Sequence, residues 1–135
     1  MVALDTNVIV RYIAQDDNRQ SKIATHIFEE VITEDNHGFL TAISLCETLW
    51  VLKRAYDQPK ETLIKVLETL LQTDFLELEH RDLVWGAIED FRNGKADFSD
   101  YFLARIGKRH GASTTFSFDA NALKAKMLFT PAEQA

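Results

Sequence analysis

The chain has 135 residues, 46% of them apolar and 27% charged, which is typical of a single globular domain. Its formal net charge of −6 argues against binding of nucleic acid over a broad basic surface. The charge is still compatible with a nuclease whose basic residues line only a local path. The one cysteine, Cys46, excludes an intrachain disulfide and fits a reducing cytoplasm. No apolar run approaches the roughly 20 residues that span a bilayer, so we expect no membrane partner.

Short apolar runs alternate with helical patterns along the whole chain. The segments predicted as strands are residues 2–4, 39–42, 75–78 and 113–118, and the predicted helices are 8–13, 17–31, 44–52, 59–71, 83–91, 98–110 and 119–127. Residues 128–135 form either a final edge strand or a tail. This alternation predicts an α/β fold, a three-layer α/β/α sandwich with a small central parallel sheet, in one domain of residues 1–135.

Four acidic residues stand where an apolar stretch gives way to a helix. Asp5 and Asp119 directly follow the first and last predicted strands, so they belong at carboxyl ends of strands, where α/β proteins place their sites. Glu47 and Asp100 lie three residues after Ser44 and Asp97, which is the spacing of a helix capping box. Each acid therefore also has a plain explanation as a cap. Carboxylates that converge on one rim repel each other unless a cation lies between them.

An all-oxygen site favours Mg²⁺ or Mn²⁺ and suits the hydrolysis of phosphodiester bonds. The metal lowers the pKa of a bound water and neutralises charge on the scissile phosphate, and a carboxylate can accept the proton of that water. A zinc site is disfavoured because the histidines are scattered without ligand spacing, at His26, His37, His80 and His110.

Four segments resemble the motifs of PIN-domain ribonucleases. Residues 4–12 (LDTNVIVRY) are similar to the opening motif, and residues 45–52 (LCETLWVL) to the helix that carries a glutamate. Residues 96–104 (ADFSDYFLA) and 115–119 (TFSFD) resemble the two closing acidic motifs. The four occur in the family's order over most of the chain. Size and form point to the VapC-like toxins of type II toxin–antitoxin pairs.

The resemblance implies an endoribonuclease that holds one or two Mg²⁺ or Mn²⁺ ions. It implies Asp5, Glu47, Asp100 and Asp119 as catalytic and metal-binding acids, with Asp97 as an additional acid. Thr6, Asn7 and Ser117 would be hydrogen-bonding groups that orient these ligands, and Ser117 stands where the family usually has Thr. Further implications are an RNA substrate, a cognate antitoxin protein, a homodimer and a cytoplasmic location.

Basic residues that could flank an RNA path are Lys53, Arg54, Arg105, Lys108 and Arg109, with Lys124 further along the chain. Each is also compatible with an ordinary solvated helix face. Trp50 and Trp85 lie on apolar helical faces, which favours core or dimer contacts over base-stacking platforms.

Two other classes of protein stay open on the residues alone. A haloacid-dehalogenase-like phosphatase would use Asp5 as a covalent nucleophile, but it needs a second aspartate at the position of Asn7. A non-catalytic module that binds Mg²⁺ and a partner would carry a similar acidic pocket without turnover.

Overall fold

The structure is a computed structural model that describes residues 1–135 and divides into two compact units, Met1–Arg81 and Asp82–Ala135. Each unit is described by itself below, and a single domain over residues 1–135 stays a prediction. The chain is α/β, with six α-helices and a small parallel sheet, as the alternation of apolar runs and helical patterns predicts. None of the helices is long and apolar enough to cross a lipid bilayer.

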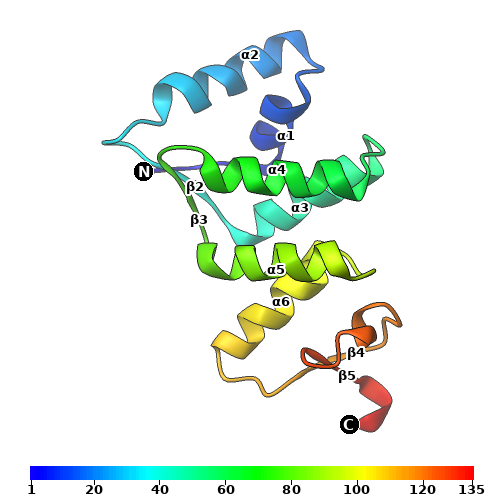
Figure 1. The fold of residues 1–135 in the computed structure, drawn as a ribbon. Coiled ribbons are helices and arrows are strands. Elements are labelled where there is room, and N and C mark those ends of the chain that lie inside the picture. The colour runs from blue at the N-terminus through cyan, green and yellow to red at the C-terminus, as the bar shows by residue number, and fades with distance from the viewer. The chain divides into compact units, whose positions relative to one another are not determined.

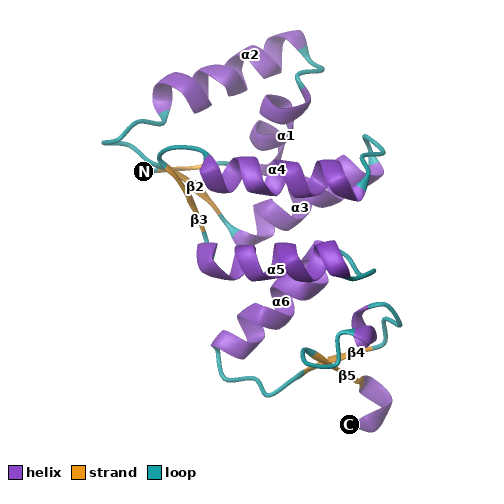
Figure 2. Ribbon diagram, viewed as in Figure 1, coloured by secondary structure: helices purple, strands orange, loops and turns teal.

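The first unit contains a three-stranded parallel sheet (Figures 1 and 2). Strands β1 (Val2–Ala3), β2 (Gly38–Leu40) and β3 (Leu76–Leu78) follow each other in that order across the sheet. Gly38 lies opposite both Val2 and Leu76, and a Cβ atom at this position would lie 2.6 Å from the Ile32 side chain. The glycine therefore lets the chain after the second helix pack closely against the central strand.

Four helices surround these strands: α1 (Thr6–Ala14), α2 (Asn18–His26), α3 (Ala42–Arg54) and α4 (Lys60–Gln72). The π-helical turn η1 (Ile27–Val31) extends α2, and the Tyr12 ring stacks on Phe28 at 4.0 Å between centroids. Helix α4 lies within the range predicted for it and buries Leu63, Leu67, Leu70 and Leu71. Ile23 does not belong to the core, because its side chain is 48% exposed beside the apolar face of α1.

The second unit contains α5 (Arg81–Asn93), α6 (Phe98–Arg109) and the parallel strand pair β4 (Thr115–Ser117) and β5 (Phe129–Pro131). Residues 128–135 thus include a strand, with Thr115 opposite Phe129, followed by the short turn η3 (Ala132–Gln134). The helix expected over 119–127 is wrong. That segment contains only the 3₁₀ turn η2 (Ala122–Lys124), which is followed by Ala125, where the backbone leaves the helical region (φ −85°, ψ 74°).

Helices α5 and α6 are fastened together by polar contacts along their length. Arg105 of α6 binds the Asp90 carboxylate of α5 with both ends of its guanidinium, at 2.5 Å (Nε–Oδ2) and 2.9 Å (Nη2–Oδ1). One turn further, Arg109 pairs with Asp82. At the other end of the pair, the buried Tyr101 hydroxyl accepts a hydrogen bond from the Ala96 N–H at 3.2 Å. The Tyr101 contact fixes the turn at the start of α6, where two of the predicted acids lie.

Candidate functional site

Asp5 occupies the N-cap position of α1, directly after β1 and the buried Leu4. Its backbone carbonyl accepts hydrogen bonds from Val8 N–H at 3.1 Å and Ile9 N–H at 3.3 Å, so the helix is begun by the main chain. The Asp5 side chain makes no capping hydrogen bond and is exposed. The explanation of Asp5 as a side-chain cap is therefore wrong, and its carboxylate is available to a ligand.

The capping box predicted from Ser44 and Glu47 is also wrong. Helix α3 begins one turn earlier, and its N-cap is Thr41, whose hydroxyl accepts the Ser44 N–H at 3.0 Å. Glu79, which follows β3, accepts the Ala42 N–H at 2.7 Å. These two side chains accept the first backbone N–H groups of the helix. Glu47 lies beyond the first turn, so it has no capping role. Glu79 was not predicted, although its place directly after a strand was a usable signal.

Glu47 is instead joined to the N-terminal motif. The Thr6 hydroxyl donates a hydrogen bond of 2.9 Å to Glu47 Oε2, across 41 residues of sequence. Thr6 is buried at 7% exposure, whereas Glu47 is exposed. A buried hydroxyl thus orients one oxygen of an exposed carboxylate and leaves the other oxygen to a ligand. This contact brings the first two predicted motif segments together in the first unit.

Asp97 and Asp100 do form the predicted capping box at the start of α6. The Asp97 N–H donates to Asp100 Oδ2 at 3.1 Å, and the Asp97 carboxylate faces the Asp100 backbone in return. Both acids are half-buried. Capping and ligand binding are compatible here, because the first turn of a helix stabilises negative charge.

Asp119 ends the loop after β4 and is exposed. Its Oδ1 accepts the Asn121 N–H at 2.8 Å and the Ala122 N–H at 3.3 Å, as an N-cap-like turn does. The Ser117 hydroxyl accepts the Asp119 N–H at 3.0 Å, so Ser117 fixes the backbone of the acid. The contact is with the backbone of Asp119 and not with its carboxylate, so a role of Ser117 in orienting a metal ligand stays a prediction.

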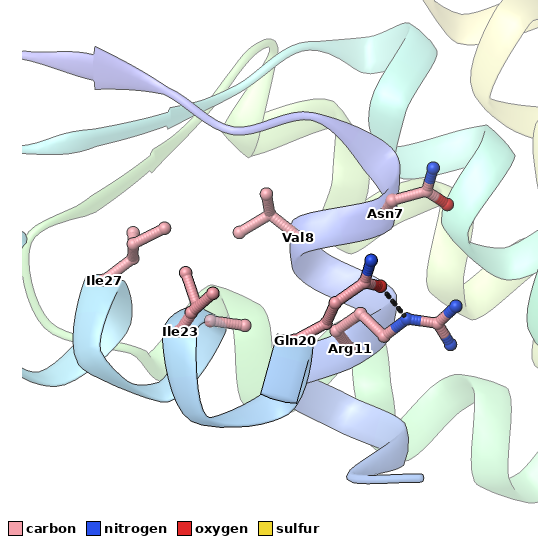
Figure 3. Close-up of a pocket in the computed structure, with 7 residues that line it drawn as sticks. Asn7, Val8, Arg11, Gln20, Ile23 and Ile27 are labelled. Atoms are coloured by element: carbon pink, nitrogen blue, oxygen red, sulfur yellow. Dashed lines mark hydrogen bonds between the residues drawn. The ribbon is translucent and has the colours of Figure 1, made fainter. Parts of the chain in front are cut away.

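Asn7 lies at the mouth of a surface pocket of about 320 Å³ between α1 and α2 (Figure 3). Val8, Ile23 and Ile27 supply apolar side chains to this pocket, and Arg11 and Gln20 close its polar side with a hydrogen bond of 2.7 Å. Arg11 also donates to Tyr56 and Asp16, and the Tyr56 hydroxyl donates to Asp16 at 2.8 Å. That hydrogen bond lowers the pKa of Asp16 and raises the pKa of Tyr56. These hydrogen bonds among Arg11, Asp16 and Tyr56 connect α1 to the loop after α3.

The predicted basic residues differ in how far they are engaged. Lys53, Arg54 and Lys108 are exposed, and Arg54 lies over the Trp50 ring at 5.2 Å. Arg105 is held by Asp90, and this hydrogen bond raises the pKa of the guanidinium. Arg109 is held by Asp82 in the same way. Trp50 and Trp85 are 57% and 44% exposed, so neither is a core residue.

The predicted donors have the chemistry of ligands for a hard divalent cation, but neither unit gathers three or more potential metal ligands into one group. Every predicted ligand is a carboxylate, and oxygen ligands are the ones that Mg²⁺ and Mn²⁺ prefer. In the first unit Asp5 has an exposed carboxylate without a cap bond, and Glu47 keeps one oxygen beyond its bond to Thr6. In the second unit Asp119 uses only Oδ1 in its turn. We predict that the acids of the first unit and those of the second unit bind the same ion.

Comparison with known proteins agrees with the sequence motifs. Residues 2–126 match the family described as the PIN domain. The chain is also similar to a protein named VapC ribonuclease from Aquifex aeolicus (strain VF5). The two are 23% identical over 118 residues, which cover 87% of each chain. The match includes every predicted acidic position, from Asp5 to Asp119.

Proposed function

The chain belongs to the PIN-domain family, and from this premise we propose that it is a metal-dependent endoribonuclease, the toxin of a toxin–antitoxin pair. The observation that carries the proposal is the family match over residues 2–126. The name of the Aquifex aeolicus relative and its similar length support the activity and the toxin role. The hydrogen bond from Thr6 to Glu47 adds structural support, because it joins two of the motif segments.

We assign the metal ligands to Asp5, Glu47, Asp100 and Asp119, with Asp97 as an additional acid. One or two Mg²⁺ or Mn²⁺ ions, when bound, supply a water of lowered pKa and neutralise the scissile phosphate. Asp5 and Asp100 act as the central ligands, and Glu47 and Asp119 complete the set. Thr6 orients Glu47, and Ser117 orients Asp119. A carboxylate not fully engaged as a ligand takes the proton of the attacking water.

The proposed partners follow from the toxin role. They are an RNA substrate, an antitoxin protein that blocks the site, and a second copy of the chain in a homodimer, all in the cytoplasm. Growth arrest on expression, relieved by the product of an adjacent small reading frame, would test the antitoxin.

The direct test is RNA cleavage by the purified protein. With Mg²⁺ or Mn²⁺ present we expect endonucleolytic products from single-stranded RNA, and with EDTA in excess of the metal we expect none. Adding Mg²⁺ or Mn²⁺ back in excess of the EDTA should restore cleavage. Ca²⁺ and Zn²⁺, which prefer different coordination, are the control ions and should restore it less well. Cleavage that persists unchanged in EDTA, or no cleavage of any RNA, would contradict the proposal.

Replacing Thr6 with valine is expected to lower the cleavage rate by roughly 10- to 100-fold, the usual effect of losing a group that orients a metal ligand. Valine keeps the shape of the buried side chain but cannot donate to Glu47 Oε2. Thr6→Ser, which keeps the hydroxyl, should retain most of the activity. Rates are compared across Mg²⁺ concentrations, because a misoriented Glu47 should raise the Mg²⁺ concentration at half-maximal activity. Equal rates for the valine and serine variants would rule out this orienting role.

A further inference from the structure

The second unit contains a surface pocket of about 370 Å³ whose lining includes none of the predicted acids. It lies where the end of α5 and the turn before α6 meet η2. Its lining includes Glu89, Asp90, Asn93, Lys95, Tyr101 and Lys124. The volume falls within the range of pockets that hold small ligands or parts of larger ones. We call it the lysine pocket.

The acids of the lysine pocket are already neutralised by neighbouring side chains. Asp90 is held by both guanidinium ends of Arg105, at 2.5 and 2.9 Å. Glu89 receives Arg92 Nε at 3.5 Å and Asn93 Nδ2 at 3.1 Å. Neither carboxylate therefore has its charge free to pair with a lysine.

The lysines of the pocket have no such partners. Lys95 and Lys124 are both exposed, and neither side chain makes a salt bridge or a hydrogen bond. Of the four charged residues in the lining, the two lysines are thus the ones without an oppositely charged partner. Two ammonium groups beside a cavity favour an anion, and the lysine ammonium is a compact charge that binds phosphate.

The positions of these lysines tie the pocket to the predicted acids. Lys95 comes two residues before Asp97, and Lys124 comes five residues after Asp119. Tyr101, which lines the pocket, holds the same turn through the Ala96 N–H. The segments that carry the acids of the second unit thus also carry two of its cations whose side chains make no ion pair.

We propose that the lysine pocket binds a phosphodiester group of the RNA strand through Lys95 and Lys124. The inference rests on the proposed function, which supplies the substrate class. RNA is favoured over a protein because the lining offers ammonium, amide and buried phenol groups, whereas protein interfaces depend on exposed aromatic or aliphatic anchors. The lysines hold the strand and take no part in the chemical step.

The test uses Lys95→Gln, Lys124→Gln and the double variant with a labelled single-stranded RNA. We expect KM to rise on the order of 3- to 10-fold for each single variant, with kcat within about twofold, because each lysine contributes one positive charge to binding of the RNA backbone. The slope of log affinity against log salt should fall by about 0.7 for each lysine removed. Lys95→Arg and Lys124→Arg should restore both quantities. Lys65→Gln, which removes an exposed lysine on α4, is the matched control and should change neither.

Binding is measured separately by fluorescence anisotropy of the same RNA with the Asp5→Asn protein. If the wild-type protein cleaves RNA but the double variant binds with the same affinity and salt slope, the lysine-pocket inference is overturned and the proposed function stands. If nothing is cleaved but RNA binding still depends on both lysines, the proposed function fails and the pocket stands. A fall in kcat without a change in KM, or competition by polyglutamate as strong as by RNA, would also overturn the pocket.

Discussion

Asp5→Asn is expected to lower RNA cleavage by about 10³-fold, which corresponds to roughly 4 kcal/mol of lost transition-state stabilisation. The amide is nearly the same size as the carboxylate but carries no charge to hold a divalent cation. Because the Asp5 side chain caps nothing, the change should leave the stability of α1 intact. Initial rates of cleavage of one single-stranded RNA at saturating Mg²⁺, with the unfolding midpoint of each protein, check both expectations.

Asp17→Asn is the matched control for this substitution. Asp17 is also an N-cap aspartate of the first unit, but its Oδ1 accepts the Gln20 N–H at 2.7 Å at the start of α2. Asparagine caps helices about as well as aspartate, so both stability and cleavage should stay near the wild-type values. If Asp5→Asn and Asp17→Asn had equal rates, Asp5 would not be a metal ligand.

Gly94→Ala is expected to destabilise the protein by about 1–3 kcal/mol, because it forces a methyl group into a packed turn. The new Cβ would lie 1.9 Å from the Tyr101 hydroxyl and 3.0 Å from the Asp90 carbonyl oxygen. Tyr101 is only 2% exposed and cannot swing aside freely. Displacing it would also break its hydrogen bond with the Ala96 N–H, directly before Asp97. Urea denaturation measures the loss.

Gly107→Ala provides a comparison of opposite sign. Gly107 lies within α6, and a Cβ atom there would meet only Ala112 and Thr115 side-chain atoms at an ordinary 3.8 Å. Alanine in a helix is favoured over glycine by roughly 0.5–1 kcal/mol, so this variant should be slightly more stable. A Gly94→Ala protein as stable as Gly107→Ala would mean that the turn before α6 is not tightly packed.

The sequence predicted well those features that depend on neighbouring residues. The strand before Asp5 and the reciprocal cap of Asp97 and Asp100 both involve residues within a few positions of each other. The prediction of the N-cap was wrong at α3, where two candidate residues lie close together in the sequence. Thr41 and Ser44 are both good N-cap residues, and only the strand that ends at Leu40 decides between them.

Contacts between residues far apart in the chain could not be predicted from the sequence. Arg105 was a candidate for an RNA path, yet its guanidinium is held by Asp90, 15 positions away. Helical periodicity placed Trp50 and Trp85 on apolar faces, but it could not tell which part of a face is covered by other elements. The bond between Thr6 and Glu47, across 41 positions, likewise follows from the packing of α1 beside α3.

The strand β5 bears on where the working domain should be considered to end. The family match stops at residue 126, whereas β5 covers Phe129–Pro131 and forms the parallel ladder with β4. A protein shortened to the family boundary would lose the partner of Thr115–Ser117 and the buried Phe129. The loop that presents Asp119 would then depend on a single unpaired strand. Domain limits taken from a family match alone would therefore remove a support of the proposed site.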